Sequence, residues 1–101
     1  MKKLILLTAI TLTAPAYADD NAHVMEKCVS LKRAAATAMK SRQIGVELDE
    51  VLAITNNQLL RTMSIQAYKQ TRYSTDEYQK RAISEFSNEW YLACLTAHGV
   101  K

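Results

Sequence analysis

Glycine, proline, cysteine and aromatic residues are all scarce in this chain. Its 101 residues include two glycines, one proline and two cysteines, and only 7% are aromatic. A fold built from many short strands needs a turn-forming residue at almost every reversal, so this composition argues against one. The strict alternation of apolar and polar residues that marks half-buried strands is also missing. We therefore expect an all-α protein.

A clustered excess of one charge is missing as well. The formal net charge of +3 includes Lys2 and Lys3, and without them eleven basic residues face ten acidic ones. Proteins that bind nucleic acid or an anionic membrane surface carry a concentrated positive patch. We therefore expect neither nucleic acid nor a membrane surface among the partners of this chain.

The first 18 residues have the three parts of a secretory signal. Lys2 and Lys3 precede an apolar run over residues 4–14, and a small-x-small site follows at residues 16–18. The apolar run is shorter than the roughly 20 residues that a membrane-spanning helix needs. We expect cleavage of residues 1–18, no stable membrane insertion afterwards, and a periplasmic or secreted product.

Residues 19–101 are expected to form a single helical domain, because apolar residues recur there at steps of three and four. Val24, Cys28 and Leu31 begin the first such stripe. Four helices follow from the stripes and their capping residues: one from an Asp20 or Asn21 cap to a stop at Gly45, one over 48–54, one from an Asn57 cap through Gln70, and one from a Ser74/Glu77 capping box to Gly99.

Two of these helices are long, at about 23 to 24 residues or roughly 35 Å each. They are expected to pack antiparallel, with the two shorter helices beside them as a small bundle. That arrangement places Cys28 opposite Cys94 at matching ends. In an exported chain with two cysteines we expect one disulfide between them, worth about 4 kcal/mol on the chain-entropy model.

Other chemistry is weakly supported. His23 and His98 lie near the same end as the cysteines, so a Cys2His2 metal site is conceivable, but the oxidising compartment favours the disulfide. Acidic and basic residues step by four along the last helix, at Glu77, Arg81, Glu85 and Glu89. Two carboxylates one turn apart could act as an acid and base pair, but this spacing favours a ladder of intrahelical ion pairs on an exposed face. The sequence shows no catalytic signature. We expect no enzyme activity, no metal and no cofactor.

The aromatic residues divide into two groups. Tyr78, Phe86 and Trp90 fall on the apolar stripe of the last helix and are expected in the core. Tyr73 and Tyr91 are not on that stripe. They are the candidate partner-contact residues, because tyrosine is enriched at protein interfaces.

Several short segments together resemble a group of small exported two-cysteine helical proteins of Gram-negative bacteria and their phages. These segments are Cys28, Met39, Arg42-Gln43-Ile44-Gly45-Val46, Ala67-Tyr68, Tyr73-Ser74-Thr75, Phe86, Tyr91 and Cys94. The resemblance spans most of residues 19–101. It implies export and a cysteine pair, and it implies no active site. By itself the Arg-Gln-x-Gly-Val segment reads as the end of the first long helix.

Three classes of function are compatible with these features. The first is a non-catalytic protein-interaction module of the cell envelope, with an envelope or periplasmic protein as partner and a possible phage or prophage connection. The second is a periplasmic stress chaperone or holdase. The third, a small enzyme, ranks last because 83 residues leave little room for a concave pocket.

Overall fold

A computed structural model describes the backbone of residues 2–100 and the side chains of residues 22–100. Across residues 2–100 it contains helices and no strands, which confirms the all-α prediction. The helices are α1 (Lys2–Ile44), α2 (Leu48–Ala53), α3 (Gln58–Tyr68) and α4 (Asp76–Ala97). In this same part of the chain, no helix combines the length and the hydropathy that crossing a membrane requires.

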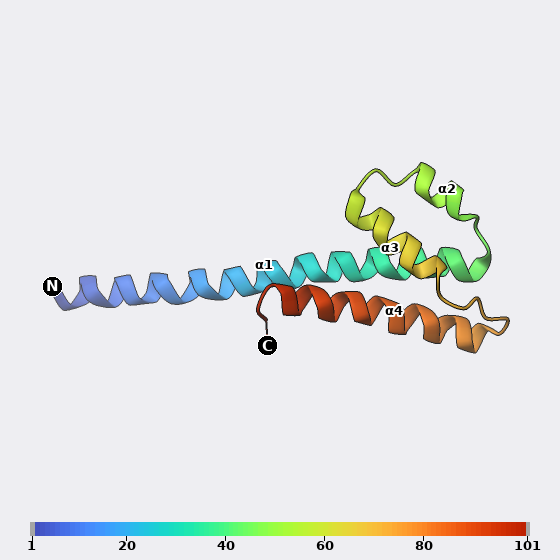
Figure 1. The fold of residues 1–101 in the computed structure, drawn as a ribbon. Coiled ribbons are helices and arrows are strands. Elements are labelled where there is room, and N and C mark those ends of the chain that lie inside the picture. The colour runs from blue at the N-terminus through green and yellow to red at the C-terminus, as the bar shows by residue number, and fades with distance from the viewer. Residues whose placement is uncertain (1, 101) are drawn as a thin grey trace.

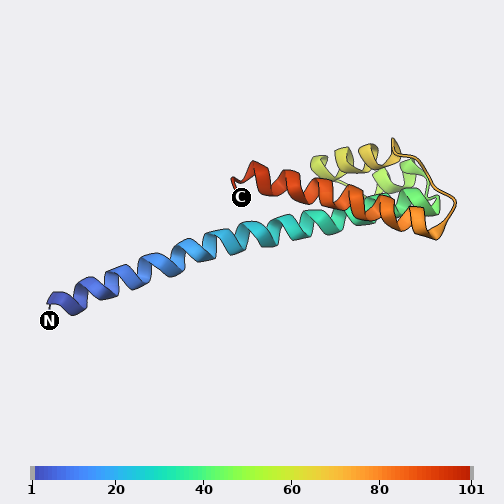
Figure 2. The same cartoon turned by 90° about the horizontal axis from the view of Figure 1, so that it is seen from below.

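The two long helices lie antiparallel, as the sequence predicts. Figures 1 and 2 show α4 running back along the second half of α1, while the first half of α1 projects beyond the bundle. Both α3 and α4 pack on α1, and α2 packs chiefly on α3. The second half of α1 is therefore the central element of the bundle.

The start of α1 differs from the prediction. The helix begins at Lys2, and no cap interrupts it at Asp20 or Asn21. In the uncleaved chain the preceding turns continue the helix, so their carbonyl groups supply the acceptors that a cap would otherwise replace. The predicted signal peptide, residues 1–18, lies where the side chains are outside the described set. Its cleavage stays a prediction.

The other helix ends follow local signals. Gly45 has φ +89° and stops α1, and the Asn57 side chain accepts hydrogen bonds from the backbone N–H groups of Leu59 and Leu60. At the start of α4 the cap is Thr75, not the predicted Ser74, since the Thr75 side chain accepts from the Tyr78 N–H at 3.3 Å. The short helices end one or two residues earlier than predicted.

The core is built from small and flexible side chains. Alanines at contact points allow helix axes to approach closely, and methionine fills the irregular gaps that remain. Leu31, Leu60, Tyr68 and Trp90 are among the partly buried residues that surround this cluster. Its buried members are Ala35, Ala38, Met39, Met63, Ala67 and Phe86.

Tyr78 is not part of the core, contrary to the prediction. Its side chain is 48% exposed, whereas Phe86 is 4% exposed and Trp90 is partly buried against the cluster. Ala93 and Ala97, which the helical spacing also places on the apolar stripe of this helix, are exposed as well. Because α4 packs mainly on one neighbour, α1, it buries a narrower stripe than a helix enclosed on several sides.

Candidate functional site

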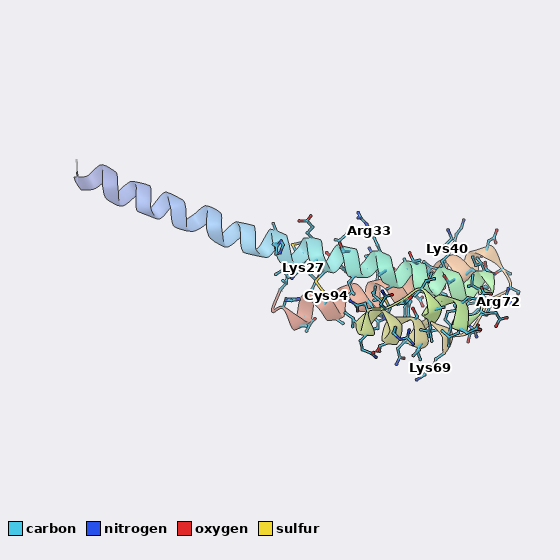
Figure 3. The ribbon with its side chains drawn as sticks, turned by 90° about the horizontal axis from the view of Figure 1, so that it is seen from above. Lys27, Arg33, Lys40, Lys69, Arg72 and Cys94 are labelled. Atoms are coloured by element: carbon cyan, nitrogen blue, oxygen red, sulfur yellow. A yellow bond between two sulfur atoms is a disulfide. The ribbon has the colours of Figure 1, made fainter. Side chains whose placement is uncertain are left out.

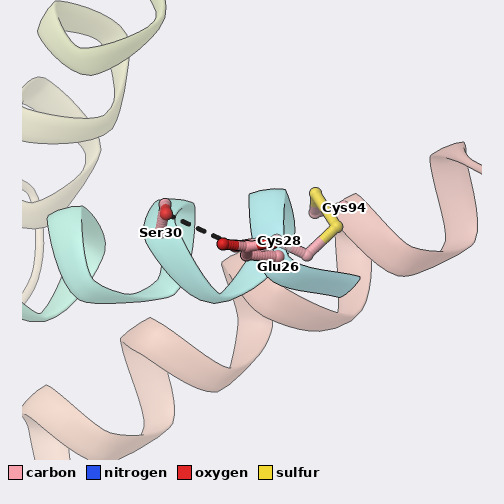
Figure 4. The surroundings of a disulfide bond; sticks show 4 residues. All are labelled: Glu26, Cys28, Ser30 and Cys94. Atoms are coloured by element: carbon pink, nitrogen blue, oxygen red, sulfur yellow. Dashed lines mark hydrogen bonds between the residues drawn. A yellow bond between two sulfur atoms is a disulfide. The ribbon is translucent and has the colours of Figure 1, made fainter. Parts of the chain in front are cut away.

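The disulfide lies near one end of the bundle. Cys28 and Cys94 are bonded, with their Cα atoms 5.6 Å apart, which confirms the predicted pairing (Figure 4). Cys28 is fully buried and Cys94 is partly buried. The bond joins α1 to α4 where no turn connects them. It fixes the register of the two helices that carry the other candidate residues.

Of the four residues considered for a Cys2His2 metal site, the structure brings three together. The sulfur atoms and a ring nitrogen of His98 lie within 4.8 Å of one another, while His23 is exposed and not in that group. Metal coordination by cysteine requires thiolates. In the oxidised protein both sulfurs are bonded to each other, so this end of the bundle acts as a covalent staple.

The opposite end is held by the side chain of Gln43. This residue is 1% exposed, and its amide N–H donates to the Thr71 carbonyl at 2.8 Å. Its amide oxygen accepts from the Tyr73 backbone N–H, also at 2.8 Å. The same amide nitrogen also donates to the Met39 sulfur at 3.3 Å. One buried glutamine of α1 thereby fixes the segment 69–75 that leads into α4.

Two arginines reinforce this connection between α1 and the segment 69–75. The Arg42 guanidinium donates to the Gln70 carbonyl at 3.1 Å, and Arg72 donates back to the Gln43 carbonyl at 3.2 Å. The Arg72 side chain lies over Gly45, where an added Cβ would come within 2.7 Å of a guanidinium nitrogen. Gly45 is needed for its positive φ, whereas the Arg72 guanidinium is the mobile end of an exposed side chain and can move away from an added Cβ.

Tyr68 joins α3 to the residue after Gly45. Its hydroxyl donates to the Val46 carbonyl at 2.6 Å, and the Arg42 guanidinium lies 5.7 Å from its ring centroid. Burial raises the pKa of Tyr68 above its ordinary value of 10.0; Arg42 partly opposes this rise, and Glu47 and Glu50 reinforce it. The phenol is thus held in its neutral, donating form.

These contacts show what sequence reasoning missed. The segments Arg42 to Val46, Ala67-Tyr68 and Tyr73 to Thr75 are far apart in sequence, yet they meet at one end of the bundle. A signal was present, because Gln43 lies one turn after Met39 on the apolar stripe of α1. A polar residue at a core position needs buried hydrogen-bond partners.

The segment held by Gln43 and the first turns of α4 together present an aromatic and cationic surface. The rings of Tyr73 and Tyr78 have centroids 5.8 Å apart, and the Arg81 guanidinium lies 5.3 Å from the Tyr78 centroid. Tyr73 is 40% exposed and Tyr78 is 48% exposed. These three residues, which we call the Tyr73 surface, line a cleft of about 320 Å³ whose lining also includes Glu85 and Glu89.

Tyr91, the second candidate contact residue, is not part of the Tyr73 surface. It lies 13 residues beyond Tyr78 on the same helix, which is about 20 Å along the axis. Its ring is partly buried, and the Lys32 ammonium of α1 lies 5.4 Å from its centroid. Tyr91 therefore contributes to the contact between α1 and α4.

Basic side chains are spread along the molecule. Figure 3 shows Arg33 and Lys40 projecting from α1, with Lys69 and Arg72 near the end that carries the Tyr73 surface. Lys27 lies close to Cys94 at the other end.

No family model, no curated protein and no solved structure matches this chain. Function is therefore inferred from its own residues.

Proposed function

We propose that this protein is a non-catalytic protein-interaction module of the cell envelope. In this proposal residues 1–18 direct export and are removed, and the remaining domain meets an envelope or periplasmic protein through the Tyr73 surface. The disulfide is compatible with an oxidising compartment outside the cytoplasm. The signal-like start of the chain supports the same location.

The observation that carries the proposal is the composition and rigidity of the Tyr73 surface. Tyrosine and arginine are the residue types that most often dominate binding energy at interfaces. Here two tyrosines and Arg81 are exposed side by side, and the backbone N–H of Tyr73 is fixed by Gln43. A surface that is ordered before binding loses less conformational entropy when a partner docks.

The test compares capture by the wild-type protein with capture by surface variants. Purified, oxidised protein lacking residues 1–18 is immobilised and exposed to periplasmic extract, and bound proteins are identified by mass spectrometry. Affinity for the purified partner is then measured by calorimetry. Tyr73→Ala or Tyr78→Ala is expected to weaken binding by roughly 2 kcal/mol, about thirtyfold.

Leu92→Ala is the matched control, because Leu92 is an exposed apolar residue of α4 outside the Tyr73 surface. Circular dichroism and thermal unfolding confirm that each variant remains folded. If Tyr73→Ala and Tyr78→Ala both bind the captured partner as tightly as Leu92→Ala does, the Tyr73 surface is not the binding site.

A holdase is the alternative function, and it is supported by scattered exposed apolar side chains on α1, directly after α2 and on α4. Ile44, Ile54 and Leu92 are the most exposed of these. A holdase suppresses aggregation of many unfolded clients, whereas an interaction module binds one folded partner. Light scattering of a reduced, unfolding client protein separates the two, since suppression near equimolar ratio would favour the holdase.

A further inference from the structure

A second concave site lies on another side of the bundle, between α1, α2 and α3. This groove has a volume of about 550 Å³, within the range of ligand-binding pockets. Its lining is mainly apolar and includes Ala34 and Ala38 of α1, Leu60 and Met63 of α3, and Val51 and Ile54. None of these six residues belongs to the Tyr73 surface.

The groove stays open because α2 stands off from α1. Figure 1 shows α2 held away from the α1–α4 pair, and none of its residues is buried. Ile54, directly after α2, is 83% exposed. An apolar element left without cover on one side is typical of a binding surface.

Hydrogen bonds hold both ends of α2, which forms one side of the groove. At the C-terminal end of α2, the Arg61 guanidinium donates to the Leu52 carbonyl in the last turn at 2.8 Å and to the Thr55 carbonyl beyond it at 2.9 Å. Before α2, the Tyr68 hydroxyl donates to the Val46 carbonyl. These bonds tie α2 and the residues on either side of it to α3, so the protein's own contacts hold α2 at the edge of the groove.

The charge along the groove indicates which ligand suits it. Glu50 lines the groove, and Glu47 and Asp49 are exposed on the same short segment. Within the described residues, no lysine or arginine lines it. The Arg61 guanidinium is engaged by the carbonyl groups of Leu52 and Thr55. An apolar floor with an acidic edge suits an apolar ligand that carries positive charge, and it disfavours fatty acids and anionic lipids.

We propose that this groove binds an amphipathic helix of a partner protein, with its apolar stripe against α1 and α3 and flanking lysines or arginines beside Glu50. Helix-in-groove recognition places apolar anchors at i, i+3, i+4 and i+7 against an apolar groove, and the lining of this groove is mainly apolar. The site does not depend on the Tyr73 surface. A protein that lacks one of these sites could still use the other.

The experiment uses the full oxidised chain and defined probes. The first probe is a fluorescein-labelled Leu/Lys peptide of about 18 residues with leucines in a helical stripe. The second has the same leucines with glutamate in place of lysine. Fluorescence anisotropy is expected to show at least about tenfold tighter binding of the Leu/Lys peptide, with affinity falling as salt increases.

Two variants locate the binding. Ile54→Ser and Glu50→Lys are each expected to weaken binding of the Leu/Lys peptide at least about fivefold. Ile44→Ser and Glu26→Lys are the matched controls, because both residues are exposed and neither lines the groove. They should bind like the wild type. Tyr73→Ala should also leave peptide binding unchanged, which separates this site from the proposed function.

Three results would overturn the proposal. The first is equal binding of the Leu/Lys and Leu/Glu peptides. The second is equal affinity of Ile54→Ser, Glu50→Lys and their controls, which would show binding elsewhere. The third is co-sedimentation with phosphatidylglycerol vesicles that Ile54→Ser abolishes, without any binding of the Leu/Lys peptide in solution, which would assign the groove to lipid.

Discussion

Replacing Gln43 with alanine tests whether this side chain orders the Tyr73 surface. The substitution removes the hydrogen bond donated to the Thr71 carbonyl and the one accepted from the Tyr73 N–H, both at 2.8 Å. Leaving a buried group unpaired costs about 1 to 3 kcal/mol. Thr71 and Tyr73 are exposed residues that water can reach, so the lower part of that range applies to each bond.

The expected total loss of unfolding free energy is about 2 to 3 kcal/mol. For a domain of this size it corresponds to a fall in Tm of about 8 to 24 °C. Ser30→Ala is the matched control, because Ser30 is exposed and its hydroxyl donates only to the Glu26 carbonyl one turn earlier in α1. Urea denaturation of Gln43→Ala and Ser30→Ala, monitored by circular dichroism, gives the unfolding free energy of each variant.

Hydrogen exchange distinguishes local loosening from general destabilisation. In Gln43→Ala the Tyr73 amide loses its acceptor, so its exchange should accelerate at least about tenfold, the equivalent of 1.4 kcal/mol. Amides in the middle of α4 should change only as much as global stability changes. If the Tyr73 amide exchanges at the wild-type rate and the urea midpoint is unchanged, Gln43 does not order this surface.

Two further predictions concern stability. Reducing the disulfide, or replacing Cys28 and Cys94 together with serine, should cost about 4 kcal/mol, because it releases a loop between residues 66 positions apart; a Tm unchanged by reductant would contradict this. Tyr68→Phe should cost about 0.5 to 1.5 kcal/mol through loss of the bond to Val46. Because the folded-state pKa of Tyr68 is raised above 10.0, the unfolded chain ionises first, and wild-type stability should fall above pH 10 through the folded pKa. Tyr68→Phe should lack this part of the alkaline loss, so identical urea midpoints against pH for both proteins would refute it.

The helices and the disulfide could be predicted because they depend on local or simple geometric signals. Gly45 and Asn57 mark helix ends through their own backbone and side-chain chemistry. Phe86 lies on a stripe that any packing of α4 would bury. Pairing Cys28 with Cys94 required only two antiparallel helices of similar length. Each of these predictions is confirmed.

The contacts at the end of the bundle where Gln43 binds the segment 69–75 could not be predicted in the same way. The hydrogen-bond partners of Gln43 lie 28 and 30 residues away, and nothing near Gln43 identifies Thr71 or Tyr73 as those partners. The exposure of Tyr78 depends on which helices flank the start of α4. The role of Tyr73 and Tyr91 as partner contacts stays a prediction, although the structure separates the two residues along α4.

The two ends of the bundle are held by different chemistry, and this difference bears on function. The disulfide constrains α1 and α4 at one end, so rigidity at the other end has to come from noncovalent contacts. The Tyr73 surface and the groove beside α2 both lie toward that second end. There Gln43, Arg61 and Tyr68 hold segments that carry little buried apolar area of their own. A residue such as Gln43 is therefore expected to affect partner binding more than its contribution to global stability suggests. Measuring partner affinity and unfolding free energy on Gln43→Ala would show this directly, since a purely structural role lowers stability and leaves the affinity of the folded protein unchanged.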